Sequence, residues 1–218
     1  MKNIPDQYPA YALSEKIADG TMHVIGVIGA ITGAVILVLW AADMAAPAQL
    51  LAIAIYGGTL IATFVASACY HMTPWEPIRP ALRRFDHAAI YLKIAGTYTP
   101  LVVMIGTGFA YAVLGIVWGL AVIGVVLKLF FWRSPGRFGP ALYLIMGWLS
   151  VALIWSLWPI LPTIALGLMA IGGLIYTGGV PFYAAENMKY SNAIWHGMVV
   201  AASACFFAAI SISAVQMG

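Results

Sequence analysis

Seven stretches of this 218-residue chain are almost free of charge and long enough to cross a lipid bilayer. A hydrocarbon core of about 30 Å requires roughly 20 apolar residues in a helix. The predicted spans cover residues 21–43, 49–71, 86–106, 109–131, 138–158, 161–184 and 192–214, with the border between the fifth and sixth least sharply defined because it contains Pro159 and Pro162. The pattern predicts an all-α membrane protein, a seven-transmembrane helix bundle.

The composition supports a membrane protein, because 63% of the residues are hydrophobic and only 8% are charged, against about a quarter charged in a soluble domain. We expect a cytoplasmic N-terminal segment, residues 1–20, and one transmembrane domain, residues 21–218. Within the segment, ALSEKIADG (residues 12–20) favours a short amphipathic helix on the membrane surface. Ser14 is its candidate N-cap and Gly20 its candidate end.

Apart from Lys93, the basic residues lie in one set of connections or at the ends of the spans that adjoin them. They occur in the N-terminal segment, in the second and fourth connections and before the last span: Lys2, Lys16, Arg79, Arg83, Arg84, Lys128, Arg133, Arg137 and Lys189. Because Lys and Arg accumulate on the cytoplasmic side of short loops, this distribution predicts a cytoplasmic N-terminus and a C-terminus outside.

The net charge of +3 needs no nucleic-acid partner, since basic residues at a membrane surface contact lipid head groups. The predicted partners are therefore membrane lipids. The short loops favour a multi-pass protein of the cell membrane, of the bacterial inner-membrane type. The oligomeric state is left open by the sequence.

Ionisable residues in membrane spans are costly and commonly mark functional sites. Given the predicted topology, five of them fall in one cytoplasmic layer: His23, His71, Asp86, His87 and His196. Ser67 shares a helix face with His71, and Asn192 shares one with His196, because each pair is four residues apart. A stripe of Glu15, Asp19 and His23 would join them only if the helix continued through Gly20. Lys93 lies deeper in the third span.

Two imidazoles and a carboxylate can hold a divalent metal, and a catalytic zinc site uses three protein ligands with one position left for water. His71, His196 and Asp86 are the candidate metal ligands. Such a site makes hydroxide available to attack an ester or amide carbonyl, with Asp86 or Ser67 as the catalytic group that orients it. The alternative is that each residue is a polar cap near the head groups, bonded to water or to a neighbouring helix end.

Several motifs resemble those of a known family. They are Glu15-x-x-x-Asp19 followed by His23, SACYH ending at His71, RRFDHAAIYLKIAGTYTP from Arg83, GGLIYTGGVPFY from Gly172, and AIWHG around His196. Over nearly its whole length, the chain resembles the hemolysin III family, the bacterial branch of the progestin and adiponectin receptor (PAQR) superfamily.

The resemblance implies a seven-helix bundle with its N-terminus inside and, by similarity to alkaline ceramidases, a zinc-dependent lipid hydrolase. The family site uses a span-two histidine and the H-x-x-x-H pair that opens span seven, while a span-three aspartate holds water at the metal. His71, Asp86 and His196 match these positions, and Ser67 matches the serine of the family's S-x-x-x-H.

This sequence departs from the family pattern at two positions. Asn192 replaces the first histidine of the H-x-x-x-H pair, and Phe206 replaces a further histidine. An amide oxygen is a poor zinc ligand, so the prediction of Zn²⁺ is conditional. It requires that Asp86 coordinate directly or that His23 or His87 take the place of the missing ligand.

Three functions therefore remain open. The first is hydrolysis of a lipid amide or ester near the cytoplasmic face. The second is a non-catalytic role in membrane homeostasis or lipid sensing, with a degenerate metal site. The third is cytolysis by pore formation. The sequence identifies no particular substrate.

Overall fold

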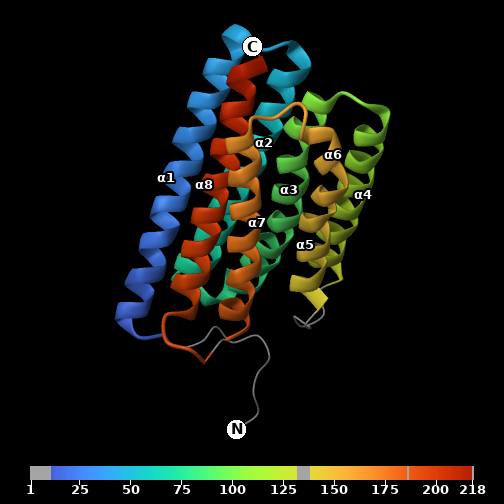
Figure 1. The fold of residues 1–218 in the computed structure, drawn as a ribbon. Helices are drawn as coiled ribbons and strands as arrows, with labels where there is room; N and C mark the ends of the chain where they lie inside the picture. The colour runs from blue at the N-terminus through green and yellow to red at the C-terminus, as the bar shows by residue number, and fades with distance from the viewer. Residues whose placement is uncertain (1–10, 132–137, 186, 218) are drawn as a thin grey trace.

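The computed structural model describes residues 11–131, 138–185 and 187–217. Within these ranges the chain forms helices and no strand. The elements are α1 (Leu13–Met44), α2 (Pro47–Met72), η1 (Glu76–Ile78), α3 (Arg79–Ile105), α4 (Gly108–Phe130), α5 (Phe138–Trp148), η2 (Leu149–Leu153), α6 (Ile154–Leu157), α7 (Thr163–Ala184) and α8 (Ser191–Met217). They form an elongated bundle in which α1 begins at one end and α8 finishes at the other (Figure 1).

Over the described residues, six helical segments are long and apolar enough to cross a membrane: α1, α2, η1 with α3, α4, α7 and α8. The fifth predicted span is present as the shorter series α5, η2 and α6, which lie end to end (Figure 1). The described part of the chain therefore has seven helical segments, in agreement with the hydropathy pattern. The predicted border between the fifth and sixth spans is also confirmed, since α6 ends at Leu157 and α7 begins at Thr163.

The fifth span is interrupted at the end of α5, where a side chain from α3 hydrogen-bonds to backbone carbonyl groups. The Tyr98 hydroxyl donates to the carbonyl of Met146 at 2.7 Å and lies 3.0 Å from that of Gly147. Ser150 Oγ also donates to the Gly147 carbonyl, at 2.9 Å. The change to a 3-10 helix at η2 is tolerated at membrane depth because protein groups satisfy the carbonyls in this way.

The first helix differs from the expectation at its start. α1 begins at Leu13 and continues through Gly20 as one 32-residue helix, so the predicted end at Gly20 is wrong. Its N-cap is Ala12 rather than Ser14, and Glu15 Oε2 accepts from the Ala12 N–H at 3.0 Å. A Cβ at Gly20 would lie 3.2 Å from Met72 Sδ. The glycine therefore serves the close approach of α1 to α2 and does not end the helix.

The centre of the bundle is α3, the most buried of the spanning segments, which packs against α2, α4, α5, α6 and α8. α1 packs against both α2 and α8. The starts of α1, α3 and α8 and the ends of α2, α4 and α7 lie together at the lower end of Figure 1, which we call the basic end. Its described basic residues are Lys16, Arg79, Arg83, Arg84, Lys128 and Lys189, whereas Lys2, Arg133 and Arg137 lie outside the described residues.

Candidate metal centre

A link between the starts of α1 and α8 brings their polar faces together. Glu15 Oε1 accepts from the Tyr190 N–H at 2.8 Å, across 175 positions of sequence. Tyr190 has a positive φ of 62°, a conformation that is uncommon for a residue with a side chain, and α8 begins at the next residue. The link holds the start of α8 beside the first turn of α1, so that Asp19 and His196 each face inward about one turn further along their helices.

A second set of contacts holds the end of α2 at the same level. Pro74 disfavours helical backbone at the residue before it, and Thr73 has the extended values φ −63° and ψ 131°. Arg79 donates to the carbonyls of Tyr70 at 3.0 Å and Thr73 at 2.6 Å, and it pairs with Glu76 at 3.0 Å. These bonds satisfy carbonyl groups left without helical partners and leave His71 in the last turn of α2.

Four side chains from three helices meet at the basic end, three of them buried and His71 partly buried. Asp19 and His23 come from α1, His71 from α2 and His196 from α8, and one potential ligand atom from each lies within 4.8 Å of all the others. Asp19 Oδ1 and His196 Nδ1 are 2.6 Å apart, and Asp19 Oδ2 lies 3.6 Å from His23 Nε2 and 3.5 Å from His71 Nδ1. One carboxylate thus faces three imidazoles.

The three imidazoles also contact one another. The ring centroid of His23 lies 5.1 Å from that of His71 and 4.3 Å from that of His196, and the last two are 4.5 Å apart. Among the described residues, His23 Nε2 is buried without a hydrogen-bond partner. Asp19 Oδ2 faces this nitrogen at 3.6 Å, beyond hydrogen-bonding distance, and a metal ion at the centre of the group would satisfy the buried nitrogen. This set of nitrogen and carboxylate donors fits zinc.

The predicted residues Asp86 and Ser67 lie beside this group. Asp86 Oδ2 is 4.0 Å from His71 Nε2, so the His71 ring lies between two carboxylates, with Nδ1 toward Asp19 and Nε2 toward Asp86. The Ser67 hydroxyl is within hydrogen-bonding reach of Asp86. The structure thus brings His71 and His196 together as expected, whereas the metal-ligand role of Asp86 and the catalytic roles of Asp86 and Ser67 stay predictions.

The spacing of Glu15, Asp19 and His23 is the sequence signal for the remaining ligands. These residues repeat every four positions, which puts them on one helix face. They join the site because α1 continues through Gly20. The structure places His23 in the group and leaves His87 outside it.

Asn192 and Phe206, the two departures from the family pattern, have different surroundings. Asn192 lines a cavity at the mouth of the site. Phe206 packs against α7, where a Cβ at Gly172 would lie 2.9 Å from its ring. Phe206 is thus a packing residue outside the metal group.

Lys93 lies about two turns further into the bundle than Asp86, as its position seven residues later on α3 requires. Its ammonium donates to Ser203 Oγ at 2.7 Å and lies 4.8 Å from the ring centroid of Phe64 and 5.1 Å from that of Tyr176. A hydroxyl and two aromatic faces thus stabilise this buried charge.

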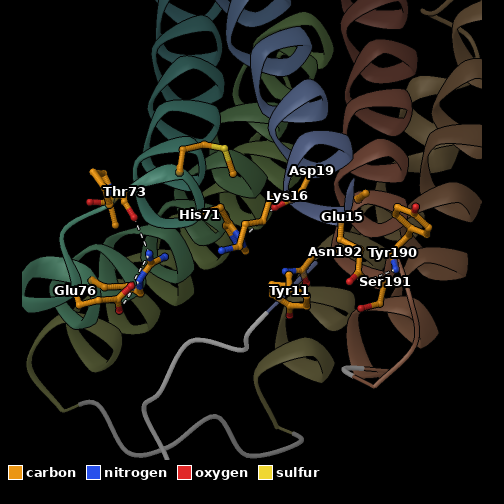
Figure 2. A pocket seen from close by; sticks show the side chains of 14 residues that line it. Tyr11, Glu15, Lys16, Asp19, His71, Thr73, Glu76, Tyr190, Ser191 and Asn192 are labelled. Carbon is orange, nitrogen blue, oxygen red and sulfur yellow. Dashed lines mark hydrogen bonds and ion pairs between the residues drawn. The ribbon is translucent and has the colours of Figure 1, made fainter. Parts of the chain in front are cut away.

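A cavity of about 510 Å³ reaches the metal group from the basic end (Figure 2). Asp19 and His71 belong to its inner wall, and the beginnings of α1 and α8 form its sides. A small polar molecule that enters at this end of the bundle can therefore reach two members of the metal group.

Together, the fold and this cavity-linked group of three histidines and an aspartate define a multi-pass helical membrane protein with a candidate metal centre at one end of its bundle. The chain matches the family described as "Haemolysin-III related" over residues 11–207. It belongs to that family, as the motifs indicated.

Individual relatives cover nearly the whole chain. It is 32% identical to the "Hemolysin-3 homolog" of Bacillus subtilis (strain 168) over 209 residues, which are 95% of this chain and 98% of that protein. It is 33% identical to "Hemolysin-3" of Bacillus cereus over 196 residues, 89% of this chain and 90% of that one. A more distant likeness, 28% over 163 residues, is to the human "Monocyte to macrophage differentiation factor", covering 72% and 67% of the two chains.

Proposed function

We propose that this protein is a zinc-dependent hydrolase of a lipid amide or ester, with its site at the cytoplasmic face of a bacterial inner membrane. The observation that carries the proposal is the buried group of Asp19, His23, His71 and His196, whose potential ligand atoms lie within 4.8 Å of one another. The concentration of basic residues at this end supports the orientation.

His23, His71 and His196 would hold the ion, so that His23 supplies the imidazole that Asn192 cannot. Asp19 orients His196 through their 2.6 Å contact, in the manner of the carboxylates that accept from metal-binding histidines. Three protein ligands leave one position open, as catalytic zinc sites require. When bound, the ion would polarise the substrate carbonyl and supply hydroxide near neutral pH.

Asp86 would act as the general base beside the ion, since its carboxylate lies 4.0 Å from His71 Nε2, and it would serve as a further ligand if it moved inward. Ser67 would orient that carboxylate from one turn before His71. The cavity at the basic end would admit water and release the polar product.

The experiment that tests the metal site is a zinc count on protein purified in an uncharged detergent without chelator. We expect about one zinc per chain, with strong loss in His23→Ala, His71→Ala and His196→Ala. His87→Ala is the matched control, because His87 is also a buried histidine near this end but lies outside the group. A parent protein without metal would refute the proposal.

Catalysis needs a separate readout. Release of fatty acid should be measured from vesicles that contain a ceramide, an amide, or a phosphatidylglycerol, an ester. Asp86→Asn should keep its zinc and lose at least about 100-fold in turnover, the usual size of a general-base contribution. If Asp86→Asn and the parent release fatty acid equally, Asp86 is not the general base. If the zinc-loaded protein cleaves neither lipid, the hydrolase assignment is wrong and a non-catalytic metal site remains.

A further inference from the structure

The start of α8 has hydrogen-bond donors that no group in the described chain uses. Tyr190 donates its N–H to Glu15, Ser191 donates to the Met188 carbonyl, and Ile194 donates to the Tyr190 carbonyl. The N–H groups of Asn192 and Ala193 have no such acceptor within the described residues. Both residues line the cavity, so two free N–H groups lie at the positive end of a 27-residue helix.

Two side chains add donors at the same place. Ser191 is only 2% exposed, and its hydroxyl has no hydrogen-bond partner among the described residues. Lys16, from the first turns of α1, is exposed, and no acid within the described ranges pairs with its ammonium. Both residues line the cavity, which Figure 2 shows bounded by α1, the start of α8 and the end of α2. A buried hydroxyl without a partner indicates a missing acceptor.

The acidic residues in the cavity wall already have partners. Glu15 accepts from the N–H groups of Tyr190 and Ala12, Asp19 contacts the histidines, and Glu76 pairs with Arg79. Apart from the Asn192 side-chain amide, which can donate or accept, the groups left for a ligand are donors and the Lys16 charge. That combination selects an anion with several acceptor oxygens, and phosphate at a helix N-terminus meets this description.

We propose that the cavity binds the phosphate of a phospholipid head group, held by the free N–H groups at the start of α8, the Ser191 hydroxyl and the Lys16 ammonium. Asn192 lies at this site, and its amide provides a further donor to the phosphate ester. The identity of the lipid as substrate rests on the proposed hydrolase function, whereas phosphate binding does not.

The distance between the proposed phosphate site and the metal group suits a lipid whose reacting group is an acyl ester. Asn192 and His196 are one helical turn apart, about 6 Å along the axis. In a glycerophospholipid, a glycerol unit bridges the phosphate and the acyl ester, and it can span such a separation. A lipid bound by its phosphate at the start of α8 would thus bring an ester carbonyl near the metal group.

The test uses delipidated full-length protein in an uncharged detergent and calorimetric titration with three short probes. These are dihexanoyl-phosphatidylglycerol, dihexanoylglycerol, which lacks phosphate, and glycerol 3-phosphate, which lacks acyl chains. We expect the phospholipid to bind and dihexanoylglycerol to bind at least about tenfold more weakly, because charge-assisted hydrogen bonds to the phosphate would be lost. If glycerol 3-phosphate binds as tightly as the phospholipid, the site takes free phosphate esters and the lipid assignment is overturned.

Variants separate this site from the general positive charge of the basic end. Lys16→Gln should weaken phospholipid binding by about fivefold, Ser191→Ala by about fivefold, and the charge reversal Lys16→Glu by more. Arg84→Gln is the matched control, because Arg84 lies at the same end but bonds to the Leu129 carbonyl, outside the cavity. Equal weakening by Lys16→Gln and Arg84→Gln would refute a built phosphate site.

A chelated sample distinguishes this inference from the metal proposal. Because the donors belong to the chain itself, phosphate binding should persist within about twofold after metal removal. Loss of binding on chelation would place the phosphate on the metal and overturn the inference. Absence of metal in the parent protein would refute the hydrolase and leave the phosphate titration as an independent result.

Discussion

Asp19 is the residue on which the metal centre depends most. The residue is 4% exposed, and its carboxylate lies against histidines from three helices, its own included. A buried carboxylate is costly unless neighbouring groups stabilise its charge. A positive ion among the three imidazoles would provide that stabilisation and would orient all four side chains at once.

Replacement of this carboxylate tests its role directly. We expect Asp19→Asn to weaken zinc binding by about 10- to 100-fold, the usual effect of losing a carboxylate that orients a metal-binding histidine. Equilibrium dialysis against buffered zinc measures the change. Asp43→Asn, an exposed carboxylate at the opposite end of α1, should bind zinc like the parent. Equal affinities of the two variants would show that Asp19 has no part in the site.

Asn192 provides a second test at the residue scale. If His23 supplies the third imidazole, the ligand set is already sufficient, and Asn192→His should leave zinc at about one ion per chain. If the site has instead decayed through loss of a histidine, the same change should raise the occupancy of a parent that holds little zinc. Mass spectrometry of the metal content, with both proteins purified in parallel, distinguishes these results.

At the scale of the elements, the fifth helical segment shows how a broken helix is accommodated at membrane depth. Tyr98 supplies a hydroxyl to carbonyls that α5 leaves at its end. We expect Tyr98→Phe to lower the free energy of unfolding by about 1–3 kcal/mol, the cost of leaving a buried acceptor unsatisfied. Thermal unfolding in detergent measures it, with the exposed Tyr111→Phe as control. A parental unfolding midpoint in Tyr98→Phe would contradict this explanation of the break.

The packing of α1 against α2 can be tested at two adjacent glycines. A Cβ at Gly57 would lie 2.9 Å from Ala34 Cβ, whereas a Cβ at Gly58 would have no neighbour within 4 Å. Gly57→Ala should therefore destabilise the protein by about 1–3 kcal/mol through overpacking. Gly58→Ala should be neutral or stabilising by up to about 1 kcal/mol, because alanine favours the helix. Equal effects of the two substitutions in the same unfolding assay would show that the contact is unimportant.

At the scale of the whole molecule, a bound metal should cross-link α1, α2 and α8. Zinc at 100 times its dissociation constant should stabilise the fold by about 2.7 kcal/mol, seen as a higher unfolding midpoint that chelator reverses. The gain should shrink as the pH falls, because protons compete for imidazole and carboxylate ligands. His71→Ala should show no response to zinc, and a response equal to that of the parent would place the ion elsewhere.

The spans could be predicted from the sequence because apolar length is a local property that hydropathy reads directly. The full metal group could not, because it depended on whether α1 continued through Gly20. That outcome is decided by contacts distant in sequence: Gly20 approaches Met72 on α2, and Glu15 binds the backbone of Tyr190. His71 and His196 could be predicted because the end of α2 and the start of α8 coincide with the limits of the apolar spans. The start of α1 does not.

The placement of Asp19 and His196 on α1 and α8 has a consequence for biosynthesis. Asp19 enters the membrane with the first helix, whereas His196 follows 177 positions later. Until α8 has been inserted, the carboxylate and the imidazole of α1 remain without this partner. A nascent chain that stalls before α8 cannot assemble the group. A bound metal would therefore distinguish fully inserted molecules from incompletely synthesised ones.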